Sequence, residues 1–156
     1  MSSMSGGDKL QKALAAMGCN LKLQMNVGIL AGATNDALEP VAPYAAANEF
    51  GTLHIPARPF MRITVAEKTG EWGAALGKLV KGKSLDGNGM TQAFNGLGPL
   101  MVQDIKNTID HVVPPESADA TVAAKIRKGL ARPEQTLVDS GVMQKSVDFE
   151  IINGGD

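Results

Sequence analysis

The stretch NEFGTLHIPARPFMR, residues 48–62, decides how the chain turns between two helices. Gly51 can adopt a positive φ, whereas Pro56 and Pro59 fix their own φ near −65°. Each proline also pushes the residue before it out of the helical region, so Arg58 is predicted to be extended. The stretch therefore predicts a stiff elbow, which holds the Arg58 guanidinium at the bend with little conformational entropy left to lose on binding.

Three roles for this elbow remain open from the residues alone. Arg58 can pair with Glu49 or Asp139 as an intramolecular clamp, because both carboxylates match a guanidinium chemically. It can instead contact another subunit. The spacing of Pro56 and Pro59 also fits a proline-rich ligand of a signalling domain.

The segments beside the elbow are predicted to be helical. An Ala-rich helix runs from Val41 and is closed by Gly51, a residue that suits the end of a helix. Pro59 stands where a proline opens a helix, and the apolar spacing that follows predicts a long helix to Val80. Residues 82–89 then form a polar, mobile loop.

A second long helix and a shorter basic helix follow the loop. Apolar residues recur every three or four positions from 94 to 112, and Pro99 either kinks this helix or marks its start. Ser117 or Asp119 is predicted to cap the basic helix, which Gly129 ends.

Two segments alternate apolar and polar side chains, as a strand with one buried face does. They are residues 21–29 and 146–151, and a third short strand is possible at 53–55. A two-stranded sheet needs support in water. The expected fold class is therefore α+β: a small antiparallel β-sheet packed against two long α-helices, with short additional helices, one of them capped by Asp8.

Length and composition point to one globular domain over residues 1–156, with a flexible arm at 1–7 and a frayed tail at 153–156. The chain is 44% hydrophobic with six aromatic residues, which predicts an aliphatic core filled out by Met and Ala. One cysteine, Cys19, excludes an internal disulfide. A signal sequence and a membrane span are not expected, so we expect a soluble protein made in the cytoplasm.

Several motifs suggest chemistry but lack the required context. Gly77 to Ser84 fits the phosphate-binding pattern G-x-x-x-x-G-K-[ST], yet it follows a helix rather than a buried strand. The calcium-like loop from Asp86 lacks the turn glycine and the closing Glu. His54 and His111 lack metal-ligand spacing and are interpreted as turn or helix-end residues. We therefore expect no enzyme activity, no cofactor and no metal.

Charge also argues against strong nucleic-acid binding. The net charge of −1 leaves no long-range field to recruit DNA or an anionic membrane. The basic residues of 125–132 are interpreted as a solvated helix face, and Asp139 with Ser140 as a helix cap. A small nucleic-acid-binding protein is kept as the alternative function, followed by a nucleotide-binding enzyme that uses Gly77 to Ser84.

The order of motifs resembles a known family. A-x-x-N-E-F-G-T is followed by I-P-A-R-P-F-M-R, a long helical middle, PPESADATVAAKIRKG and TLVDSGVMQKSV before a last strand. This order is similar to the tail-completion or head-tail joining (neck) proteins of tailed bacteriophages, also labelled virion morphogenesis or minor tail proteins. The similarity spans roughly residues 25–152, and NEFGT with IPARPF is its most specific part.

The resemblance implies a non-enzymatic structural protein of the virion neck, present in the host cytoplasm during assembly. It would form a homo-oligomeric ring, six-fold by analogy, between the head connector or head-closure protein and the tail terminator or tail-tube protein. Genome DNA would pass through the lumen without sequence-specific binding. Replacing Arg58 with Ala would then leave a folded protein but give tailless heads or unjoined tails.

The candidate assembly residues lie in the elbow and in the VDSG block. They are Asn48, Glu49, Phe50, Gly51, Pro56, Arg58, Pro59, Phe60, Asp139 and Gly141.

Overall fold

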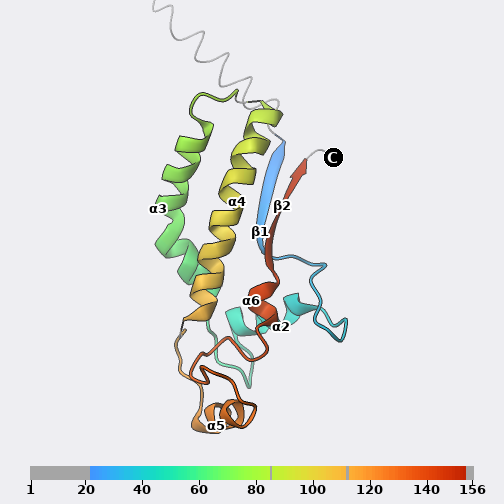
Figure 1. Ribbon diagram of the computed structural model, residues 1–156, viewed down its shortest axis with the longest axis vertical. Coiled ribbons are helices and arrows are strands. Elements are labelled where there is room, and N and C mark those ends of the chain that lie inside the picture. Colours follow the sequence, from blue (N-terminus) through green and yellow to red (C-terminus); the bar gives the residue numbers. More distant parts are fainter. Residues whose placement is uncertain (1–21, 85, 112, 154–156) are drawn as a thin grey trace, which may run out of the picture.

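The computed structural model describes residues 22–84, 86–111 and 113–153 (Figure 1). The helix and the arm predicted before residue 18 lie outside these residues. The elements, in chain order, are β1 (Leu23–Ile29), α2 (Val41–Phe50), α3 (Phe60–Val80), α4 (Gly87–Asp110), α5 (Asp119–Arg127), α6 (Val142–Lys145) and β2 (Val147–Asn153). The expected α+β class is confirmed.

Both strands predicted from alternation are present, and they pair with each other. β1 and β2 are antiparallel, with Leu23 opposite Asn153 and Ile29 opposite Val147. Val147 is buried, and the apolar side of β1 packs against the same core through Val27 and Ile29. The sheet joins the two ends of the described chain, because its strands come from opposite ends of the sequence.

The third strand considered possible at 53–55 does not form. These residues form a tight turn in which the Thr52 hydroxyl accepts hydrogen bonds from the amides of His54 (3.2 Å) and Ile55 (3.0 Å). The Thr52 amide donates to the Ile55 carbonyl at 2.8 Å. The local hydroxyl therefore closes a turn where the apolar pattern suggested a strand.

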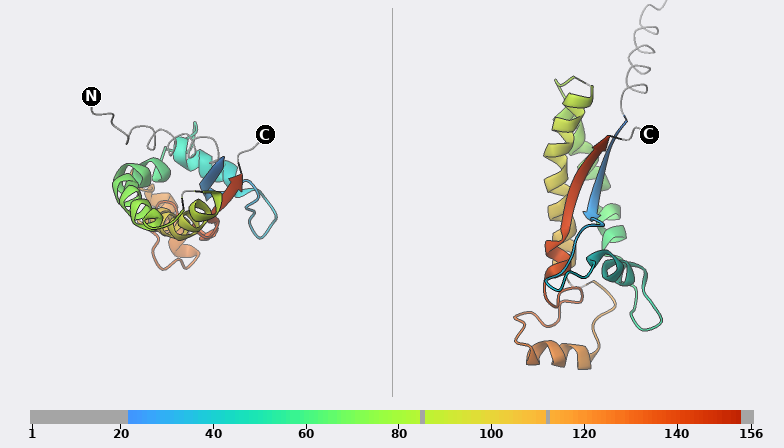
Figure 2. Two further views of the ribbon diagram at one scale, coloured as in Figure 1. Left: turned by 90° about the horizontal axis from the view of Figure 1, so that it is seen from above. Right: turned by 90° about the vertical axis from the view of Figure 1, so that its right-hand side faces the viewer.

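The two long helices run side by side in opposite directions, with α4 between α3 and the sheet (Figures 1 and 2). α4 contacts both strands. The first turn of α3 reaches β1, where Met61 lies against Gly28. Trp72 of α3 donates from Nε1 to the Asp104 carboxylate of α4 at 2.7 Å, which ties the two helices together.

The core lies where the lower halves of the long helices in Figure 1 meet α2, α6 and the strands. It is aliphatic apart from one phenylalanine, as the composition predicted. Its buried members are Val41, Ala45, Phe60, Ile105, Ile109, Val113, Leu137, Met143 and Val147.

The start of α4 differs from the prediction, since 87–89 are helical rather than part of a mobile loop. The Asp86 carboxylate accepts a hydrogen bond from the Gly89 amide at 2.8 Å and so caps the helix. That bond lowers the pKa of Asp86. Pro99 lies inside the helix, so it does not mark the start. The cap outweighs the low helix propensity of the Gly-Asn-Gly sequence.

Two other helix starts also differ in detail. Pro59 was predicted to be the first helical residue of α3, but it occupies the N-cap position just before the helix. Ala118 is the N-cap of α5, and neither Ser117 nor Asp119 caps it with a side chain. The predicted end of α5 at Gly129 is close to the observed end at Arg127, and Gly129 takes a φ of 76° just beyond the helix.

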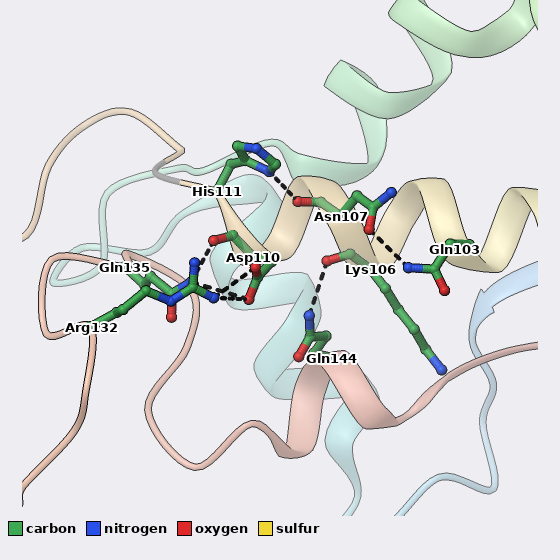
Figure 3. A network of polar contacts seen from close by, with 8 residues as sticks. All are labelled: Gln103, Lys106, Asn107, Asp110, His111, Arg132, Gln135 and Gln144. Carbon is green, nitrogen blue, oxygen red and sulfur yellow. Dashed lines mark hydrogen bonds and ion pairs between the residues drawn. The ribbon is translucent and has the colours of Figure 1, made fainter.

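A polar network fastens the C-terminal end of α4 to the segment after α5 (Figure 3). Both oxygens of the Asp110 carboxylate lie 2.7 Å from Nη2 of Arg132, and Gln135 donates to the same carboxylate at 3.1 Å. Gln144 donates to the Lys106 carbonyl at 3.2 Å. A carboxylate at a helix C-terminus interacts unfavourably with the negative end of the helix dipole. The positive charge of Arg132 offsets this unfavourable interaction for Asp110.

This network predicts an acid-dependent loss of stability. The hydrogen bond from Arg132 lowers the pKa of Asp110 below its usual range. A depressed folded-state pKa stabilises the fold above the unfolded value of about 3.9, and that contribution is lost as pH falls through the folded value. Asp110→Asn should cost up to about 1 kcal/mol at pH 7, because the pair is partly in solvent. Urea unfolding at pH 7 and pH 3 should show the difference shrinking in acid, and a constant difference would contradict this assignment.

Candidate assembly surface

The Glu49 carboxylate closes the elbow from inside. It is only 6% exposed, and its Oε2 accepts from the Met61 amide at 2.9 Å. Its Oε1 accepts from the Arg62 amide at 3.2 Å and from Arg62 Nε at 2.9 Å. The first amides of a helix have no partner within it, and Pro59 has no side-chain acceptor. Glu49 at the end of α2 therefore caps α3 from another helix, where the helix dipole also favours an anion.

The backbone closes the opposite side of the elbow. Gly51 has a φ of 78°, and a Cβ at this position would lie 2.9 Å from the Ala57 nitrogen. The Asn48 carbonyl accepts from the Arg58 amide at 2.6 Å. Only glycine fits at this close approach with this φ. The stiffness predicted for the elbow thus comes from packing as well as from its prolines.

Of the three roles left open for Arg58, the clamp onto Glu49 or Asp139 does not form. Its Nε donates to the Pro115 carbonyl at 2.9 Å and its Nη2 to the Glu116 carbonyl at 3.4 Å. Glu49 pairs with Arg62 instead, and Asp139 pairs with Lys128 at 3.0 Å. The reason is the course of the chain at the bend. The Arg58 side chain reaches the loop after α4, whereas the start of α3 lies against Glu49.

Two hollows flank α2. The first, which we call the β1–α2 groove, has a volume of about 600 Å³ and lies between β1 and the small side chains Ala42 and Ala46. Phe50 also lines it, with the Arg62 guanidinium 5.4 Å from the centre of its ring. The second, which we call the elbow pocket, lies between the elbow, residues 115–118 and α5, and has a volume of about 530 Å³.

The structure places the candidate assembly residues around these hollows but leaves few of them on the surface. Asn48, Glu49, Arg58 and Phe60 are buried. Those that line the elbow pocket are Asn48, Pro56, Arg58 and Asp139, whereas Gly141 lines a neighbouring hollow beside α2 and α6. Phe50 is 71% exposed. Most of the motif therefore shapes the elbow, and Phe50 is its large exposed member.

Exposed apolar side chains are frequent in and beside α2. Eight large hydrophobic residues are exposed among those described, and four of them fall within 38–53. Leu38 (81% exposed) and Leu53 (98%) lie in the loops on either side of α2. Exposed apolar clusters on soluble domains often mark interaction surfaces. Sequence reasoning missed both leucines, although an apolar residue within a turn-forming segment was a usable signal.

The predicted solvated basic face at 125–132 is correct only in part, because Arg127, Lys128 and Arg132 are exposed whereas Lys125 is not. Lys125 is buried and donates from Nζ to the Gln135 and Val138 carbonyls. Lys128 and Arg132 pair with Asp139 and Asp110. The chain after α5 folds back over the helix, which no local pattern of charges could indicate.

Gly77 to Ser84 and the two histidines lie where their context predicted, whereas Gly141, and neither Asp139 nor Ser140, is the N-cap of α6. Residues 77–80 form the last turn of α3, His54 lies in the turn of the elbow, and His111 is the C-cap of α4. Within the described ranges no three His, Cys, Asp or Glu side chains could hold a metal ion. In the same part of the chain, no helix has both the length and the apolar character needed to cross a bilayer.

Comparisons with protein-family models, curated proteins and solved structures found no match to this chain.

Proposed function

We propose that this chain is a structural protein of the neck of a tailed-bacteriophage virion. In this proposal it forms a ring that completes the tail and joins it to the head connector, with a lumen for DNA. The resemblance of residues 25–152 to tail-completion and head-tail joining proteins supports the proposal. The observation that carries it is the elbow, in which the two most specific motifs of that resemblance form one closed unit.

The elbow gives the surface around α2 a fixed shape. NEFGT and IPARPF are held together by the Glu49 cap and by the Asn48 to Arg58 backbone hydrogen bond. Phe50 and Leu53 remain exposed on this rigid frame. Preorganised side chains lose less entropy on docking, so they suit contacts between subunits.

The sheet offers a second route to assembly. A two-stranded sheet has one outer edge on each strand, and unpaired edges are templates for pairing with another chain. A head-to-tail contact between unlike surfaces closes into a ring when its rotation allows. The net charge of −1 suits a lumen through which DNA passes without being gripped.

The proposal predicts that removing the exposed apolar side chains prevents assembly without unfolding the chain. Phe50→Ser combined with Leu53→Ser should keep a wild-type circular dichroism spectrum, because both side chains are largely in solvent. A phage that encodes the variant should produce tailless heads or unjoined tails, which negative-stain images would show. This pair is a better probe than Arg58→Ala, since Arg58 contacts the loop after α4.

Val65→Ser is the matched control, because Val65 is also exposed but lies on α3. It should support normal virion yield. Normal yield from the Phe50 and Leu53 double variant would contradict the proposal. Tight binding of duplex DNA that falls steeply with added salt would instead favour the nucleic-acid-binding alternative.

A further inference from the structure

The elbow pocket contains two cations that have no carboxylate partner within the described chain. Arg58 and Lys125 both line it and are 8% and 6% exposed. The carboxylates that form ion pairs in the described residues are Glu49, Glu71, Asp139 and Asp110, and none of these pairs includes Arg58 or Lys125. A buried cation is normally compensated by an anion, because its desolvation is costly.

The hydrogen bonds of Arg58 leave part of its guanidinium available. Nε and Nη2 donate to the Pro115 and Glu116 carbonyls. Nη1 makes no hydrogen bond with the described residues. Every fully buried side-chain nitrogen or oxygen in the described chain has a partner, so Nη1 is accessible to solvent.

Lys125 is in a similar position. Its ammonium group has three donors, of which two reach the Gln135 and Val138 carbonyls. Burial lowers the pKa of both Lys125 and Arg58. The Asp139 carboxylate raises the pKa of Lys125 in part, and the charge of Arg58 lowers it. The pocket therefore brings two buried positive charges together, which favours the binding of an anion.

We propose that the elbow pocket binds a single carboxylate group, supplied by an acidic side chain of another protein chain. Arg58 would contact it with its free guanidinium nitrogen and Lys125 with its third donor. A single carboxylate fits better than the backbone of DNA, because Glu116 and Asp139 line the same pocket and would repel a polyanion. That the other chain is a second copy in a ring rests on the proposed function; the binding of a carboxylate does not.

Sodium acetate is the simplest probe of this site. In NMR titrations of the full chain at constant ionic strength, acetate should shift the Arg58 Nε–H and Lys125 ammonium signals in a saturable way. Acetamide has the same shape without the charge and should not shift them. Arg58→Gln should weaken acetate binding at least fivefold, read from Lys125. Arg127→Gln removes the same charge from the exposed side of α5 and should change binding less than twofold.

A second variant tests the pocket without removing a cation. Thr121 lines the pocket four residues before Lys125, the favourable spacing and order for an acidic residue and a lysine on a helix. Thr121→Glu should therefore raise the melting temperature and abolish the acetate response, whereas Thr121→Gln should do neither.

Three results would overturn the inference. They are no saturable acetate response in the wild-type chain, equal responses in the two arginine variants, and saturation by inorganic phosphate but not by acetate. Virion yield is not part of this test, so its outcome and that of the neck proposal can be told apart.

Discussion

Replacing Glu49 with Ala is expected to lower the free energy of unfolding by about 3 kcal/mol. The change removes a buried carboxylate that accepts three hydrogen bonds, two of them from backbone amides at the start of α3. Bonds to a charged group contribute about 1.5–3 kcal/mol, and an amide left without a partner adds its own desolvation cost. Urea unfolding of the variant and the wild type at pH 7 measures the difference.

Two matched variants separate the cap from the ion pair. Arg62→Ala removes only the side chain, which is 60% exposed, so it should cost less than about 1 kcal/mol. Glu49→Gln keeps one acceptor and should fall between the wild type and Glu49→Ala. If Arg62→Ala proved as damaging as Glu49→Ala, the ion pair rather than the helix cap would be the main contribution of Glu49.

The elements with strong local signals were predictable from sequence. The alternation in 21–29 and 146–151 predicted both strands, and the alanines before Gly51 predicted α2. In each case the local pattern and the tertiary fold demand the same conformation, because one face is buried and the other faces water. The pairing of β1 with β2 followed from having two convincing strands, each of which needs a partner.

Partners of the charged side chains were not predictable. Glu49 was a candidate partner of Arg58, yet it binds Arg62, four residues later. Either pairing is chemically reasonable, and the choice depends on the angle at which α3 leaves the elbow. That angle is set by contacts between distant segments, such as the hydrogen bonds of Arg58 to residues 115 and 116.

The segment after α5 shows the same limit more strongly. A run of basic residues normally indicates a solvated face, but Lys125 is buried under 135–138. Nothing in the spacing of the charges signals that cover. The positive character of the elbow pocket, and with it the proposed carboxylate site, therefore emerges only from the folded chain.

The second large effect is expected at Gly98, where α4 crosses β2. A Cβ built there would overlap Cδ2 of Phe149 and would lie 2.6 Å from two further ring atoms. Gly98→Ala gains about 1 kcal/mol of helix propensity but forces the ring or the helix to move, which typically costs 1–3 kcal/mol and sometimes more. Because the overlap involves several ring atoms, we expect a net loss of about 2 kcal/mol in urea unfolding.

Gly73→Ala on α3 is the matched control, because the Cβ it would add meets nothing within 4 Å beyond its chain neighbours and the backbone of its own helix. It should raise stability by about 0.5–1 kcal/mol, since only the cost of a helical glycine is removed. Combining Gly98→Ala with Phe149→Leu should cost less than the sum of the two single changes, because the smaller side chain relieves the overlap. Simple additivity of the two changes would show that α4 and β2 are not in close contact here, and the layer order in which the sheet rests on α4 would have to be revised.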